Sequence, residues 1–432
     1  MALDRTYQCK KHVVIKHIAN NIVAYLTLTH SIVMFSKFYT SLVLGASLLS
    51  LTTACMGQTG EPVEKNKANS NYKPAFAGQT RIGSVKTKTP YTATVISTEL
   101  KGPWGIHVLP DGRLLISSKP GTMQIVKTDG KIDKTITGFP EVQFAGQGGL
   151  LDVNIDPDFI KNRMIYWTYA QPGDGATLAV AKGKLSADET KLENVRVIFE
   201  ATPRYKGAGQ FGSRLLFDKK GNIFVSTGDR MADDIRVKAQ DLSATTGKVI
   251  HITKDGKPVA DNPFIGKAGA KPEIYALGFR NPDGFSINPV TGDLWEAEFG
   301  PRGGDEINLI KPGGNYGWPY VTYGIEYSGQ KVYDGIQQKK GTIQPVYYWD
   351  PVISPGCMMF YTGNIAEWKN NLFVGGLSGQ HIIRLVIKDN KVVGEERLLA
   401  DKNERWRCMA TGKDGAIYAA TDAGKLYKIA KQ

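Results

Sequence analysis

The feature that most constrains this fold is a short unit that recurs six times along the chain: a turn rich in Asp, Gly or Asn, followed directly by an apolar strand. The six units begin at Asp111, Lys161, Lys220, Thr291, Lys369 and Asp414. Turn residues that precede β-branched or aromatic residues are typical of hairpins. Their recurrence without a long helical period indicates sheets arranged around an axis. The sequence therefore predicts an all-β, six-bladed β-propeller, with a β-sandwich as the simpler alternative.

The chain has 432 residues, a length that could hold two or three domains. All-β architectures often reach this length as a single domain, so one propeller at residues 91–432 accounts for it. Residues 56–90 are polar and rich in Lys, Asn, Thr and Gly, which predicts a flexible tether. Residues 1–55 are predicted to be an N-terminal extension that ends in an export signal.

The export signal follows Met34, which we predict to be the natural start of the protein. Lys37 gives a positive beginning, residues 42–51 form an apolar run, and small residues precede Cys55; this order is typical of a secretory signal. Cys55 also resembles the lipidated cysteine of bacterial lipoproteins. We therefore expect an exported, periplasmic protein, with attachment to the membrane through a lipidated Cys55. A membrane anchor is the alternative, although the apolar run is short for a span.

The formal net charge is +13. No run of Lys or Arg stands out after residue 55, and no nucleic-acid-binding motif is visible, so the sequence predicts no nucleic-acid partner. A charge spread in this way is an argument about solubility rather than about fold.

The stretch 278–320 is dense in Gly, Pro and Asn and carries the most chemistry. Arg280 and Asn281 offer a guanidinium fork and an amide before a proline, which favours an extended or turn backbone. Carbonyl groups at 300–301 and carboxylates at 305–306 supply the oxygen ligands that calcium prefers. A structured surface loop with an Arg–carboxylate pair is the alternative interpretation.

Two further sites stand out. In Glu404-Arg-Trp-Arg, strand alternation places Arg405 and Arg407 on one face and Trp406 on the other. Two guanidinium forks on one face suit a polycarboxylate, although an exposed strand face would look the same. Gln147 lies among glycines that let the backbone approach a ligand closely; a tight turn before a strand is the alternative.

Three of these motifs carry a resemblance to a known family. Residues 278–284 (GFRNPDG), 298–310 (EFGPRGGDEINLI) and 315–319 (NYGWP) resemble the glucose/sorbosone dehydrogenase family, and the likeness extends from about Gly102 to the C-terminus. The resemblance implies a six-bladed propeller that binds pyrroloquinoline quinone (PQQ) and calcium. It also implies oxidation of aldose sugars at C1 to lactones, with electrons passed to an external acceptor.

The resemblance implies a role for each matched residue. Gln147 would face the quinone, Arg280 and Asn281 would contact its oxygens, and Arg405 and Arg407 would bind its carboxylates. The carbonyls of Gly300 and Pro301 would hold the catalytic calcium, and Asp305 or Glu306 a second calcium. Trp349 would lie near the sugar, with a tryptophan buried in the core as the alternative.

Two departures from the family pattern concern catalysis. Gln210 stands where the family has the histidine that takes the proton from the sugar, and an amide cannot act as a base near neutral pH. Asp229 is a hypothetical substitute. A lysine found near Ser378 in relatives is also missing here. These departures favour the alternative of a non-catalytic propeller that binds a sugar or PQQ. A metal-dependent lactonase is a third interpretation, and it would not need Arg405 and Arg407.

Two cysteines, Cys357 and Cys408, follow the export signal. In an oxidising compartment they could form a disulfide, and two free buried thiols are equally consistent with their spacing.

Overall fold

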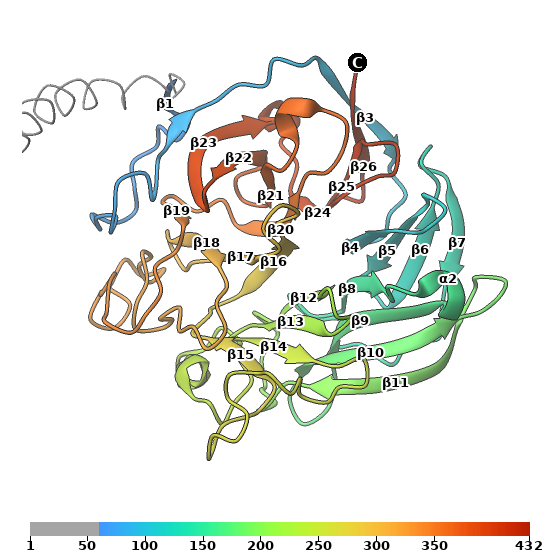
Figure 1. The fold of residues 1–432 in the computed structure, drawn as a ribbon, viewed down its shortest axis with the longest axis horizontal. Coiled ribbons are helices and arrows are strands. Elements are labelled where there is room, and N and C mark those ends of the chain that lie inside the picture. The colour runs from blue at the N-terminus through green and yellow to red at the C-terminus, as the bar shows by residue number, and fades with distance from the viewer. Residues whose placement is uncertain (1–59) are drawn as a thin grey trace, which may run out of the picture. The chain divides into compact units, whose positions relative to one another are not determined.

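The computed structural model of the protein describes residues 60–432. The predicted export signal, Met34 and Cys55 lie outside these residues. Six sheets surround a common centre (Figure 1), so the prediction of an all-β, six-bladed propeller is confirmed.

The first three blades follow one another along the chain. Blade one contains β4 (Pro103–Val108), β5 (Leu114–Ser118), β6 (Thr122–Val126) and β7 (Ile132–Ile136). Blade two contains β8 (Leu150–Ile155), β9 (Met164–Gln171), β10 (Thr177–Leu185) and β11 (Leu192–Glu200). Blade three contains β12 (Gly212–Phe217), β13 (Ile223–Thr227), β14 (Lys248–Ile252) and β15 (Ile274–Leu277).

The remaining blades draw on both ends of the described chain. Blade four contains β16 (Pro282–Ile287), β17 (Leu294–Glu298), β18 (Asp305–Leu309) and β19 (Tyr347–Trp349). Blade five contains β20 (Pro355–Phe360), β21 (Leu372–Gly376), β22 (Ile382–Lys388) and β23 (Lys391–Leu398), extended at its outer edge by β2 (Gly83–Ser84) and β1 (Gly60–Pro62). Blade six contains β24 (Trp406–Thr411), β25 (Ile417–Thr421), β26 (Leu426–Lys431) and β3 (Tyr91–Ser97).

Within the described residues the helices are short and lie in the connections. They are α2 (Phe159–Asn162), α3 (Asp233–Arg236), η1 (Val237–Gln240), η2 (Ala366–Trp368) and η3 (Ala400–Lys402). Within residues 60–432, none has the length and apolar character that crossing a membrane requires.

The six repeated units are the turns that lead into the second strand of each blade. In every unit the chain takes a positive φ one or two residues before this strand, at Gly112, Arg163, Gly221, Gly292, Asn370 and Gly415. Glycine and asparagine tolerate this left-handed backbone best, and it suits a tight hairpin. Local turn chemistry therefore sets one hairpin per blade.

The core is divided among the blades. Six hydrophobic clusters each join the side chains of two neighbouring blades, because alternate residues of a strand point to opposite faces of its sheet. Cys357 belongs to the cluster between blades five and six, and Cys408 to the cluster between blades six and one. Both cysteines are buried and free, because they point into different clusters.

The ring is closed by its two ends. β3, from the beginning of the described chain, pairs antiparallel with β26 at the C-terminus (Figure 1). Hydrogen bonds between these strands therefore join the first and last parts of the propeller into one sheet.

Residues 60–90 are not the flexible tether that their composition predicts. They run along blade five toward β3 (Figure 1), and Val85 N–H donates to the Glu395 carbonyl oxygen at 3.0 Å. The Asp350 carboxylate accepts hydrogen bonds from both the backbone and the side chain of Asn69 and of Ser70, at 2.8–3.0 Å. The polar side chains that suggested a tether are used as hydrogen-bonding partners of the propeller. We call residues 60–84 the strap.

Every inner strand carries a β-bulge near its beginning. The register shifts lie between Pro103 and Ile106, Leu150 and Val153, Gly212 and Leu215, Pro282 and Gly284, Pro355 and Cys357, and Trp406 and Cys408. A bulge leaves residues unpaired and re-aims their side chains, and bulges are common beside active sites. Here the bulges turn one residue or more from each blade toward the centre.

Candidate functional site

A cavity of about 450 Å³ lies beside the beginnings of the inner strands. It collects eight of the residues singled out from the sequence: Gln147, Gln210, Arg280, Asn281, Gly300, Pro301, Arg405 and Arg407. They come from the segments that precede or enter the inner strands of blades two, three, four and six, with Gly300 and Pro301 from the β17–β18 connection. One cavity therefore joins motifs that are far apart in the sequence.

Arg405 and Arg407 lie side by side on Asp422. Each donates from Nε to one carboxylate oxygen of Asp422, at 2.8 Å. Burial would raise the pKa of Asp422, but Arg407 and Arg405 together hold it below its ordinary value. Trp406 points the other way, fully buried between blades five and six. Within residues 60–432 the Arg405 side chain hydrogen-bonds only through Nε, which leaves both of its Nη groups available to an anion.

Arg280 is buried and held from several sides. Its Nη1 donates to the carbonyl oxygens of Gly300 at 2.7 Å and of Phe299 at 3.1 Å, and its Nη2 donates to the Tyr327 hydroxyl at 3.3 Å. Its backbone N–H donates to Glu298 Oε2 at 2.6 Å. The guanidinium is therefore fixed at the wall of the cavity.

Asp305 positions the site through hydrogen bonds to both of its carboxylate oxygens. Its Oδ1 accepts from Gly300 N–H at 2.8 Å, and its Oδ2 accepts from Ile353 and Ser354 N–H at 2.7 and 2.6 Å. Burial raises its pKa to about 7 despite these three donors. These hydrogen bonds give Asp305 a role in shaping the Gly300 loop, and its role as a calcium ligand stays a prediction.

Glu306 lies outside the main cavity. It belongs to a face of blade four that also carries Glu296, Glu298 and Asn308, and Asn308 Nδ2 donates to Glu296 at 3.1 Å and to Glu306 at 3.3 Å. Burial, followed by the charge of Glu298, raises the pKa of Glu306 well above its ordinary value. In the described part of the chain no three His, Cys, Asp or Glu side chains are arranged to hold a metal ion. A cation near Glu306 would therefore need carbonyl oxygens as well, and Gly300 lines the same small internal space.

Trp349 is not at the site. It lies in β19 with 2% of its surface exposed, packs edge-to-face on Tyr347 and belongs to the core between blades four and five. The prediction that it lies near a sugar is therefore wrong in this structure. The aromatic residues that line the cavity are Trp104, Phe211, Phe299 and Tyr327.

Gln210 faces the cavity from the position of the expected base. Its backbone N–H donates to Gln147 Oε1 at 2.6 Å, which couples two of the predicted cofactor contacts. Its own Oε1 is buried and has no hydrogen-bond partner among residues 60–432. An unpartnered buried acceptor costs free energy, so a donor from a ligand would stabilise it.

Asp229 does not serve as the substitute base proposed from the sequence. Its Oδ1 accepts from Met231 N–H at 2.8 Å, its Oδ2 accepts from Trp318 Nε1 at 2.7 Å, and it does not line the cavity.

Sequence reasoning missed two charged residues that line the cavity. Lys119, in the turn between β5 and β6, donates from Nζ to the Gly146 carbonyl oxygen at 2.9 Å, and burial followed by the charge of Arg407 lowers its pKa. One signal in the sequence pointed to such a residue: the lysine that relatives carry near Ser378 is missing, so another part of the chain could supply the cation. Asp283 lies in the quoted motif at residues 278–284, but nothing local shows that a bulge turns it inward.

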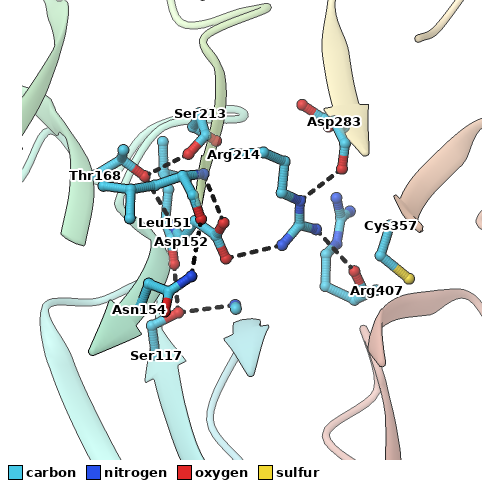
Figure 2. A network of polar contacts seen from close by, with 12 residues as sticks. Ser117, Leu151, Asp152, Asn154, Thr168, Ser213, Arg214, Asp283, Cys357 and Arg407 are labelled. Atoms are coloured by element: carbon cyan, nitrogen blue, oxygen red, sulfur yellow. Dashed lines mark hydrogen bonds and ion pairs between the residues drawn. The ribbon is translucent and has the colours of Figure 1, made fainter. Parts of the chain in front are cut away.

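The side chain of Arg214 joins the blades beneath this cavity, and we call it the Arg214 hub (Figure 2). It pairs with the Asp152 carboxylate at 3.0 Å and donates from Nε to the Asp283 carbonyl oxygen at 2.6 Å. Its other contacts reach the three remaining blades: the carbonyl oxygens of Gly356 and Arg407, and the ring of Trp104. A second cavity of about 320 Å³, lined by later residues of the inner strands, includes Arg214 and shares no lining residue with the first.

Comparison with known proteins identifies the family. Residues 100–428 match the family described as glucose/sorbosone dehydrogenase. The chain belongs to this family. It is 39% identical over 342 residues to the aldose sugar dehydrogenase YliI of Escherichia coli (strain K12), with 78% of this chain and 91% of that protein covered. It is 25% identical over 417 residues to quinoprotein glucose dehydrogenase B of Acinetobacter calcoaceticus, with 77% and 86% covered.

A solved structure of the same family supports the fold. The crystal structure of the soluble aldose sugar dehydrogenase from Escherichia coli in its apo-form has a TM-score of 0.76 and 38% sequence identity to this chain. The alignment covers 79% of this chain and all of that chain.

The cavity of this glucose/sorbosone dehydrogenase family member fits an anionic ligand. Four cationic side chains line it, Lys119, Arg280, Arg405 and Arg407, beside one carboxylate, Asp283. Planar guanidinium forks match carboxylate geometry in two-point contacts. The free donors of Arg405 and the unpartnered oxygen of Gln210 are therefore suited to a ligand that has both carboxylates and hydrogen-bond donors.

Proposed function

We propose that the protein is a PQQ-dependent dehydrogenase that oxidises aldose sugars at C1 to lactones and passes the electrons to an external acceptor. One observation carries this proposal: Arg405 and Arg407 are fixed on Asp422 in the same cavity as Arg280, Asn281 and Gln147. The name of the Acinetobacter relative, a quinoprotein, supports the cofactor, and the name of YliI supports the substrate class.

The chain's own residues would bind and orient the reactants. Arg405 and Arg407 would hold the carboxylates of the cofactor, and Lys119 would add a third cation on the same side of the cavity. Arg280, fixed on Gly300, would stabilise negative charge that develops at the quinone oxygens, as a preorganised donor does. When bound, PQQ supplies the oxidant, an ortho-quinone that accepts two electrons and a hydrogen from the sugar.

Calcium is proposed at the carbonyls of Gly300 and Pro301. The Gly300 carbonyl oxygen already accepts from Arg280 at 2.7 Å, but a carbonyl has a second lone pair that can bind a cation. A cation there would withdraw electron density from the oxygen that it binds on the cofactor. Asp305 and Glu306 are the carboxylate candidates for a second calcium.

Gln210 favours a second candidate function, a propeller that binds PQQ or a sugar without turning it over. An amide has no proton-accepting site near neutral pH, and loss of a general base typically costs about 10²–10⁴ in rate.

The test is dye-linked oxidation of a panel of aldoses by the full chain, with and without PQQ and calcium. We expect oxidation that depends on PQQ and is lost in Arg405→Ala/Arg407→Ala, whose binding of PQQ, followed by absorbance, should also be lost. Inactivity of the unaltered protein, with activity in Gln210→His, would instead favour the binding module. Oxidation that does not require PQQ, or PQQ binding that survives the loss of both arginines, would contradict the proposed site.

A further inference from the structure

The proposed reaction leaves one proton without an acceptor. Oxidation of a C1 hydroxyl releases a proton, and Gln210 cannot take it. His107, His251 and His381 do not line the 450 Å³ cavity, and burial lowers the pKa of His107 to about 4. Asp229 is occupied by Met231 and Trp318. A base must therefore be sought among the other side chains of the cavity.

Asp283 is the one carboxylate that lines this cavity. It is the unpaired residue in the bulge of β16, between Pro282 and Gly284. The Arg214 hub holds its backbone carbonyl at 2.6 Å (Figure 2), which fixes the main chain from which the carboxylate projects. Arg280 and Asn281, two contacts proposed for the quinone, precede it directly in the chain.

The charges around Asp283 leave its carboxylate without a partner of its own. Arg214 pairs with Asp152, and Arg407 pairs with Asp422. Among residues 60–432 no Lys, Arg or His lies within ion-pairing distance of the Asp283 carboxylate, and the neighbouring side-chain amide of Asn281 lowers its pKa. A carboxylate placed in this way keeps acceptor capacity for a hydroxyl group.

We propose that the Asp283 carboxylate accepts the proton of the sugar's anomeric hydroxyl, in place of the base that Gln210 cannot provide. This inference rests on the proposed function. In the step, the O–H bond breaks and its proton moves to the carboxylate. The C1–H bond breaks as its hydrogen leaves with both electrons to the quinone, and a C1=O bond forms. The protonated carboxyl then releases its proton to solvent.

The residues around Asp283 set the pKa of its carboxyl group. Burial raises its pKa to about 7, against the opposing effect of Arg214 from β12 and Arg407 from β24. Asp152 from β8 raises its pKa further. Lys119, from the turn after β5, and Glu296 of β17 are the other charged groups that interact with it. A general base is most effective when its pKa lies near the working pH.

The experiment compares the unaltered full chain with Asp283→Asn, which keeps the shape of the side chain and removes the base. We expect kcat to fall by about 10²–10⁴, the loss of rate below about pH 7 to disappear, and the absorbance change on PQQ binding to be unaffected. Gln210→His in the Asp283→Asn background should recover part of the rate. Asp174→Asn, a charge-matched change on the exposed surface, is the control and should change none of these.

A second readout needs no cofactor. A buried acid whose pKa is raised on folding destabilises the folded state as the pH rises past its unfolded value. The melting temperature of Asp283→Asn relative to the unaltered apo-protein should therefore increase between pH 5 and pH 8, whereas that of Asp174→Asn should not.

The outcomes separate this inference from the proposed function. If the unaltered chain oxidises no aldose with PQQ and calcium, both are overturned. If it does, and Asp283→Asn retains its rate within a factor of about three with the same acid limb, only the role of Asp283 is overturned. A PQQ-dependent rate that collapses in Asp283→Asn, with cofactor binding intact and partial recovery by Gln210→His, supports the proton acceptor.

Discussion

At the scale of single residues, the site depends on the buried cation Arg214, which lies beneath the cavity. The Arg214 hub reaches all the other blades because a guanidinium presents five N–H donors in a planar fork. Its side chain and that of Asp152 are each less than one-tenth exposed. Arg214 also donates to the backbone carbonyls of Asp283 and Arg407. It therefore positions two residues of the cavity without lining the cavity itself.

Replacing this hub should be costly. In Arg214→Met the Asp152 carboxylate is left buried without its partner, and a change of this kind typically costs about 3–5 kcal/mol. Arg405→Met is the control, since its ion pair with Asp422 is half exposed and should be worth at most about 1 kcal/mol. Urea unfolding measures both, and Arg214→Met/Asp152→Leu should recover part of the loss. Equal, small losses in the two single variants would show that Arg214 holds nothing together.

At the scale of elements, the sequence predicts what is local and misses what depends on register. The second strand of each blade could be found because Asp, Gly and Asn create its turn within a few residues. A bulge depends on two strands at once, so Asp283 and Arg214 could not be located at the centre. Trp349 was misplaced because its role was taken from the family resemblance, which does not say which face of which blade a side chain occupies. The strap was missed because its partner Asp350 lies about 280 residues away.

Blade four offers a prediction about pH. Glu296 and Glu298 of β17 face Glu306 and Asn308 of β18. Burial raises the pKa of Glu298 to about 8, and that of Glu296 well above its ordinary value. The folded protein holds these protons at a pH where the unfolded chain has lost them. The contribution of the two carboxyl groups to the free energy of unfolding is therefore fully present below about pH 4 and is lost as the pH rises toward 8.

Glu296→Gln should therefore stabilise the protein at alkaline pH. It removes a carboxyl group that must bind a proton on folding once the unfolded chain has ionised it, and its new amide can donate to Asn308 Oδ1, which lies opposite and has no partner within residues 60–432. In a chelating buffer we expect the variant to unfold at a higher temperature than the unaltered protein at pH 8, by on the order of 1–3 kcal/mol in stability, with a smaller gap at pH 5. A lower melting temperature at pH 8 would contradict the raised pKa of Glu296.

At the scale of the whole molecule, the ring is completed by a strand from the other end of the chain. β3 pairs with β26 along most of its length, from Ser97 with Leu426 to Tyr91 with Lys431. The strap, by contrast, adds only the short strands β1 and β2 to an edge of blade five that is already complete. Loss of β3 would therefore expose the edge of β26, whereas loss of the strap would leave the four strands of blade five in place.

Two truncations separate these contributions. A chain that begins at Val85 loses the strap but keeps β3, so we expect a folded monomer with a lower melting temperature, because the Asp350 carboxylate exchanges its protein partners for water. A chain that begins at Lys101 also loses β3, which uncovers the edge of β26 and its unpaired N–H and C=O groups; such an edge invites pairing with another chain. Size-exclusion chromatography and thermal unfolding should show aggregation or unfolding for the second chain alone. A monomeric, cooperative second chain would mean that the packing between blades six and one closes the ring without the strand.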